Sequence, residues 1–111
     1  MSEHLDESLL TELQEIMEDE FGLLLETYLT ESVGQFQRVR DDYASGDLGA
    51  LKRSAHSLKG SCANVGAVRS AEFCQRIESG ASAGHVDGLD EVLQGLRAEL
   101  DEVRQLLESR L

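Results

Sequence analysis

Apolar residues recur at helical spacing along nearly the whole chain of 111 residues, and no proline interrupts them. Proline breaks helices more strongly than any other residue, so its absence is compatible with long continuous helices. The last segment shows the pattern most clearly, because apolar residues fall three or four positions apart from Leu89 to Leu107. No alternating pattern typical of strands competes with it. The chain is therefore predicted to be all-α.

Five helical segments follow from this periodicity and from the residues at their ends. We expect helices over residues 6–19, 21–43, 48–63, 67–79 and 89–111. Asp6 and Asp47 stand where side-chain oxygens cap a first helical turn. Gly34 is expected to loosen or bend the second helix, and residues 80–84 to form a flexible loop. Four long helices with short connections predict an antiparallel four-helix bundle with an additional N-terminal helix, in a single domain of residues 1–111.

The charge of the chain excludes several classes of function. Its 22 acidic and 10 basic residues give a net charge of −12, which repels nucleic-acid phosphates and anionic membrane surfaces. No apolar stretch approaches the roughly 20 residues that span a bilayer, and the acidic N-terminus does not resemble a secretory signal. We therefore expect a cytoplasmic protein. Cys62 and Cys74 form no CxxC motif and are expected to be thiols in the core.

One histidine stands apart from the core pattern of its helix. The core stripe of the third helix is formed by Leu51, Ala55, Leu58 and Cys62. His56 follows Ala55 directly, so it is turned roughly 100° away, onto an exposed flank. Gly60 comes one turn later, although glycine inside a helix costs about 1 kcal/mol relative to alanine. Close approach of another protein or of a phosphoryl group would explain this glycine; an incidental glycine on an exposed helix is the alternative.

The charge is reversed around His56. Residues 48–77 hold five bases and one acid, Glu72; the bases are Lys52, Arg53, Lys59, Arg69 and Arg76. Such a patch attracts phosphoryl groups or acidic partner surfaces. A neutral imidazole is a competent nucleophile at cytoplasmic pH. The sequence thus favours phosphoryl chemistry at His56, with Lys59 offsetting charge one turn along.

Residues 55–67, AHSLKGSCANVGA, resemble the histidine-containing phosphotransfer (HPt) domain of bacterial phosphorelays. The family pattern is close to A-H-x-[LI]-K-G-[SA]-x-x-x-x-G, and the likeness in length and helix order covers essentially the whole chain. The resemblance implies a four-helix bundle with an extra N-terminal helix. It also implies that His56 accepts a phosphoryl group from a receiver-domain aspartate of a hybrid sensor kinase and passes it to a response regulator.

The same resemblance implies roles for the residues around His56. Lys59 would stabilise the phosphoryl group, and Glu78 on the next helix would orient the imidazole. A receiver domain would dock over Arg53, Gly60, Ser61 and Ala63, and Arg69 and Arg76 could lie near the rim. The chain has no glycine-rich ATP-binding motif, so we expect a phosphoryl carrier without autokinase activity. We also expect it to be a monomer. It would hold no metal or cofactor, because Mg²⁺ would sit in the receiver.

Three other functions are compatible with a helical bundle, and the residues bear on each of them. A metal-binding bundle is disfavoured because His4, His56 and His85 are widely separated and no Glu-x-x-His pair exists. A hydrolase is disfavoured because no serine or cysteine nucleophile with a partnered acid is evident. The more serious alternative is a non-catalytic helical protein-interaction module in which His56 is incidental. His4 is expected in a frayed terminus, His85 in a flexible loop, and residues 18–20 in a solvated acidic turn.

Overall fold

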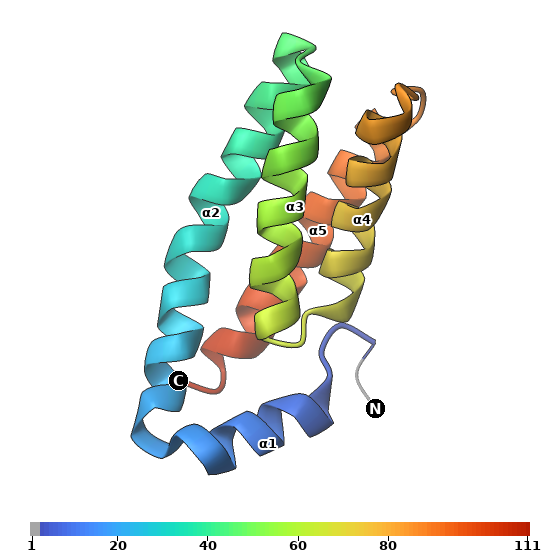
Figure 1. Cartoon of the computed structure of the whole chain (residues 1–111). Helices are drawn as coiled ribbons and strands as arrows, with labels where there is room; N and C mark the ends of the chain where they lie inside the picture. Colours follow the sequence, from blue (N-terminus) through green and yellow to red (C-terminus); the bar gives the residue numbers. More distant parts are fainter. Residues whose placement is uncertain (1–2) are drawn as a thin grey trace.

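The computed structural model describes residues 3–111, which form five α-helices and a short 3₁₀ turn (Figure 1). The helices are α1 (Glu7–Met17), α2 (Phe21–Ser45), α3 (Leu48–Asn64), α4 (Val68–Ala83) and α5 (Leu89–Glu108). The 3₁₀ turn, Glu18–Glu20, is exposed, as expected for the acidic turn. No strand occurs within the described range. The predicted all-α bundle is confirmed.

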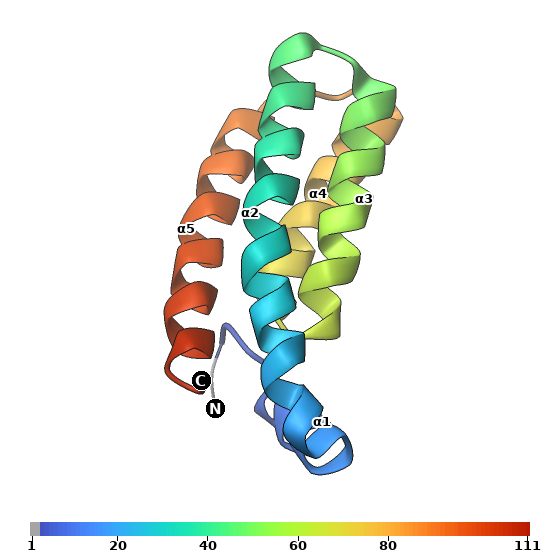
Figure 2. The ribbon, with the colours of Figure 1, turned by 90° about the vertical axis from the view of Figure 1, so that its left-hand side faces the viewer.

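The four long helices run along one axis, and α1 lies across one end of the bundle (Figures 1 and 2). Helix α3 packs closely against α4 on one side and against α2 on the other, and α4 also packs against α5. Helices α2 and α5 approach each other less closely than the other neighbouring pairs of long helices. The helices therefore follow each other around the bundle in chain order, and the seam between α2 and α5 is the loosest.

The core consists of the apolar faces that the sequence pattern predicted. All four residues of the α3 core stripe, from Leu51 to Cys62, are fully buried, and so is Cys74 on α4. Both cysteines are free thiols, as expected. Burying a leucine- or valine-sized side chain contributes about 1.5–3 kcal/mol, so these stripes dominate the stability of the fold.

Two aspartates begin their helices as predicted. The side chain of Asp6 accepts a hydrogen bond from the Leu9 amide at 3.0 Å, and that of Asp47 accepts from the Ala50 amide at 3.0 Å. Each bond satisfies an amide that the first helical turn leaves without a partner, and such a cap contributes about 1 kcal/mol.

The prediction of a flexible loop over residues 80–84 is wrong. Helix α4 continues to Ala83 and ends at Gly84, whose φ of 75° is left-handed. The helix continues because Ala81 is buried and Gly80 packs tightly, since a β-carbon there would lie 2.9 Å from the His85 carbonyl oxygen. At Gly34, helix α2 continues without a break.

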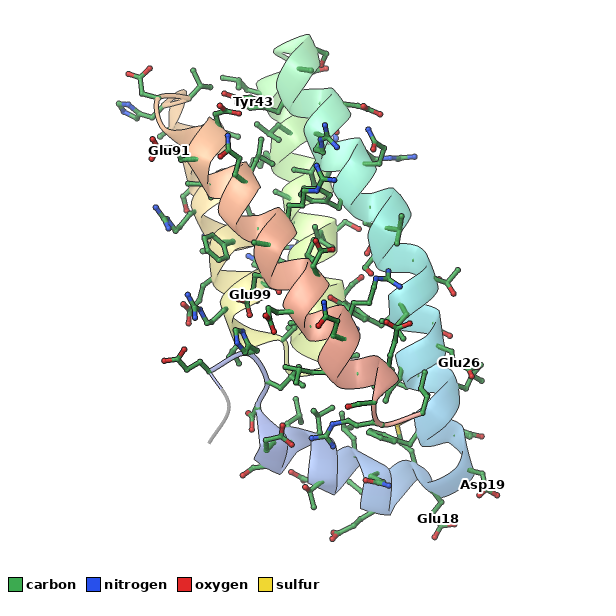
Figure 3. All side chains as sticks on the ribbon, turned by 180° about the vertical axis from the view of Figure 1, so that it is seen from behind. Glu18, Asp19, Glu26, Tyr43, Glu91 and Glu99 are labelled. Carbon is green, nitrogen blue, oxygen red and sulfur yellow. The ribbon has the colours of Figure 1, made fainter. Side chains whose placement is uncertain are left out.

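The expectation of a frayed segment around His4 is also wrong. Its Nδ1 lies 2.7 Å from Oε2 of Glu99, a buried residue of α5 that Figure 3 labels. The Asp6 amide donates to the carbonyl oxygen of Gly66, in the turn between α3 and α4, at 2.8 Å. The segment before α1 is therefore held against two parts of the bundle. His85, by contrast, is exposed in the loop before α5.

Candidate functional site

His56 lies on the exposed flank of α3, with 66% of its side chain accessible. Its Nδ1 is 3.1 Å from Oε2 of Glu78, which α4 brings alongside. Glu78 itself is only 16% exposed, because it sits in the seam between the two helices. A carboxylate at this distance accepts the Nδ1 proton and thereby holds the tautomer in which Nε2 carries the free lone pair. The structure thus brings together the histidine and the acid that the family resemblance paired.

Lys59 is held in the same seam. Its Nζ donates to Oε1 of Glu78 at 2.7 Å and to Oε1 of Gln75 at 2.8 Å, and 26% of its side chain is exposed. Lys59 is therefore only partly exposed, because α4 packs over this flank of α3. The hydrogen bond from Lys59 holds the pKa of Glu78 below its ordinary value of 4.5, and the bond with His56 lowers it further. Glu78 is therefore a charged carboxylate at neutral pH.

Three polar residues near His56 were missed in the sequence. Gln75 accepts from Lys59 and donates through Nε2 to the Ser79 hydroxyl at 2.9 Å. On α2, Nε2 of Gln35 donates to the hydroxyl of Ser57, the residue after His56, at 3.4 Å. Helical spacing could have placed Gln75 on the face of Glu78, three residues before it, and Ser79 next to Gln75, four residues after it. Nothing local points to Gln35, because its neighbour belongs to another helix.

The expected docking residues take up two different positions on α3. Arg53, His56, Gly60 and Ala63 follow each other at spacings of three and four and are all exposed. A β-carbon at Gly60 would meet no atom within 4 Å, so the fold of this chain does not itself require a glycine there. Ser61 is half-buried and turned roughly 140° from His56, and thus lies outside this exposed strip.

Arg69 and Arg76 do not border His56, contrary to the expectation that they lie near the rim. Arg69 reaches toward Glu3 at 3.4 Å and Glu99 at 4.0 Å, and Arg76 lies 5.9 Å from the centre of the Phe73 ring. Both arginines belong to the side of α4 that faces α5. Counting bases along the chain placed them near His56, but the rotation of α4 about its own axis turns them away.

The chain matches a family of known proteins over most of its length. The model of the family described as Hpt domain matches residues 23–106, from the start of α2 nearly to the end of α5. The chain belongs to the Hpt domain family. Hpt proteins are phosphocarriers rather than classical enzymes, they interact with receiver domains, and their role lies in phosphorelays. The alternative of an interaction module without phosphotransfer is not favoured.

A solved structure extends the match of this Hpt chain to α1. The crystal structure of histidine-containing phosphotransfer protein B (HptB) from Pseudomonas aeruginosa PAO1 is similar over 99% of this chain and 96% of that one. The two chains are 34% identical, with a TM-score of 0.95. A search of curated proteins finds no match.

Two further observations concern metal ions and membranes. Within residues 3–111, no group of three or more histidine, cysteine, aspartate or glutamate side chains is arranged to hold a metal ion. No helix in the same range is both long and apolar enough to cross a membrane.

Proposed function

We propose that His56 is the residue of this Hpt protein that is phosphorylated, and that it carries the group between receiver domains. The observation that supports this most directly is the contact between its Nδ1 and Glu78 on an otherwise exposed ring. That contact orients the imidazole and leaves Nε2 facing solvent. Nε2 is then the nucleophile that a docked receiver meets.

Phosphoryl transfer to His56 requires no proton to leave the imidazole ring. Nε2 attacks the phosphorus of an aspartyl phosphate on the donor receiver, so that an N–P bond forms and the bond from phosphorus to the aspartate oxygen breaks. The aspartate departs as a carboxylate, and the imidazole becomes cationic. Glu78 faces that cation through Nδ1 and stabilises it. Onward transfer reverses these steps, as the carboxylate of a second receiver takes the phosphoryl group.

The neighbours of His56 have supporting roles in this proposal. The Lys59 ammonium has three N–H donors, of which Glu78 and Gln75 accept two, so one remains for a phosphoryl oxygen. Gly60 and Ala63 keep the strip beside His56 free of bulk, and Arg53 adds a charge for docking. Mg²⁺ would be held by the receiver, and this chain would act in the cytoplasm as a monomer without a cofactor.

The test is transfer from a purified receiver domain that carries labelled phosphate on its aspartate. We expect the wild-type protein to take up label that is stable in base and lost in acid, as a phosphoramidate is. His56→Gln should take up none, whereas His85→Gln, which removes an exposed histidine far from the site, should take up label normally. An unlabelled wild-type protein, or equal labelling of His56→Gln, would contradict the proposal.

A further inference from the structure

A long groove lies between α2 and α5, on the face opposite His56. The pair formed by His56 and Glu78 occupies the seam between α3 and α4, and the seam between α2 and α5 is across the bundle from it. Figure 3 shows the molecule from behind, so that this face is toward the reader, and labels Tyr43 near one end of α2. Two adjoining hollows of about 200 and 320 Å³ form the groove and share Phe36, Arg40 and Arg97.

The groove is elongated, and two apolar stripes run along a lining that also contains polar side chains. Phe36 and Tyr43 on α2 are seven residues apart, as are Leu93 and Leu100 on α5, so each helix contributes a stripe two turns long. Val33 lies at the edge with 59% of its surface exposed. The lining runs along α2 from Tyr28 to Ala44, which is about 24 Å at 1.5 Å per residue. A groove of this shape suits an elongated segment such as a helix better than a compact small molecule.

The groove is lined by three arginines, Arg40, Arg97 and Arg104. Among residues 3–111 none of them is within ion-pair distance of an acid, although the chain has 22 acidic residues. Two acids, Asp90 and Asp101, also line the groove, yet within the described residues neither forms an ion pair with these arginines. Arg104 donates to the carbonyl oxygen of Leu29 at 2.9 Å, which leaves its positive charge without a carboxylate. The arginines are thus available to an acidic ligand.

We propose that the groove between α2 and α5 docks an acidic amphipathic helix of a partner protein. The apolar face of such a helix would cover the stripes of Phe36 and Leu100, and its carboxylates would pair with the three arginines. A second copy of this chain is a poorer occupant, because two chains of charge −12 repel each other and their own acidic helix α1 is packed on the bundle end. The partner helix can stay bound while a receiver docks at His56, on the other face.

The probe for this site is a synthetic helical peptide of about 18 residues, or five turns, with leucine on one face and glutamate on the other. It is titrated into the ¹⁵N-labelled full chain. We expect chemical-shift changes concentrated in residues 28–44 and 90–104, and binding that weakens with salt because exposed ion pairs are screened. Arg40→Glu with Arg97→Glu should raise Kd at least about tenfold, since like charges then face each other.

Matched control variants distinguish binding of the peptide in the groove from non-specific electrostatic attraction to the protein. Lys52→Glu with Arg76→Glu makes the same charge change on α3 and α4 and should leave Kd unchanged. Arg40→Gln with Arg97→Gln should weaken binding by a smaller factor, which keeps the test valid if the glutamate pair fails to fold. All these variants should give the far-UV circular dichroism spectrum of the wild-type protein, which shows that they are folded.

Several outcomes would overturn the proposal. They are shifts confined to α3 and α4, equal binding of a peptide with lysine in place of glutamate, or unchanged affinity in both arginine variants. Concentration-dependent dimers that the arginine substitutions abolish would assign the groove to a second copy instead. Labelling at His56 is a separate measurement, so failure of either proposal can be told from failure of the other.

Discussion

Glu78 divides its two carboxylate oxygens between the two residues that matter most at the site. One oxygen faces Nδ1 of His56 and the other accepts from Lys59. The lysine hydrogen bond is the main reason that the pKa of Glu78 lies below its ordinary value, and it keeps the carboxylate charged. A single side chain thus fixes the imidazole tautomer and at the same time ties α3 to α4.

The lowered pKa of Glu78 predicts how stability depends on pH. A carboxyl group whose folded-state pKa is depressed adds stability above its unfolded pKa, and this stability is lost as pH falls through the folded pKa. The difference in free energy of unfolding between the wild type and Glu78→Gln should therefore be constant near pH 7 and shrink below about pH 4.5. Denaturant unfolding at a series of pH values measures it. A difference that grows on acidification would contradict this assignment.

At the scale of the helices, glycines serve two opposite purposes. Gly60 on α3 faces open space, whereas Gly80 on α4 touches the chain that follows it. A β-carbon at Gly80 would lie 2.9 Å from the His85 carbonyl oxygen and 3.1 Å from Leu89. The His85 amide also donates to the Gly80 carbonyl at 2.8 Å, so this chain segment cannot easily move away. The same residue type therefore marks an open surface on one helix and a tight contact on the next.

Gly60→Ala should stabilise the fold and impair transfer. Alanine is favoured over glycine inside a helix by up to about 1 kcal/mol, and nothing in this chain meets the added methyl group. On a surface where a receiver must approach closely, the same methyl group should slow phosphotransfer. Thermal unfolding and transfer kinetics measure the two effects. Gly22→Ala, which also adds its methyl group in open space, is the control and should transfer at the wild-type rate.

Gly80→Ala should have the reverse effect on stability. Its methyl group overlaps a backbone carbonyl, and overpacking of this kind costs about 1–3 kcal/mol. Denaturant unfolding should show a loss of free energy of unfolding, while transfer by the folded fraction stays normal because Gly80 does not contact His56. A variant as stable as the wild type would show that the loop before α5 can shift.

At the scale of the whole molecule, the N-terminal segment closes one end of the bundle. Leu5 and Leu10 are buried to 2% and 0% exposure, so they extend the core beneath α1. The segment is fastened by His4 to Glu99, by the Asp6 amide to Gly66, and by an ion pair between Glu7 and Arg110. Helix α1 is therefore an integral part of the bundle rather than an appendage.

Loss of the His4 contact should destabilise the whole fold. In His4→Ala the buried carboxylate of Glu99 loses its 2.7 Å contact and, among residues 3–111, keeps the longer one to Nε of Arg69 at 4.0 Å. A buried group left unsatisfied costs about 1–3 kcal/mol. The free energy of unfolding should fall by that amount. Adding Glu99→Leu should restore most of it, because the buried charge is then gone. His85→Ala, at an exposed site, is the control and should leave stability unchanged.

Much of the fold could be predicted from the sequence because it depends on local spacing. Helical periodicity and capping aspartates determined where α1 and α3 begin, and the buried stripe of α3 put His56 on the exposed flank beside it. These features concern neighbours within a turn or two of one helix. The phosphorelay motif belongs to the same category, because it lies within a single helix and the turn after it.

Only the tertiary structure decided which residues of different helices meet. The rotation of α4 about its axis brings Glu78 to His56 and turns Arg69 and Arg76 toward α5, and no spacing within α4 determines that rotation. It results from the packing of all four helices at once. The same holds for His4 at Glu99, 95 residues away along the chain. The sequence determined that His56 is exposed, and the packing of the helices determined which side chains lie next to it.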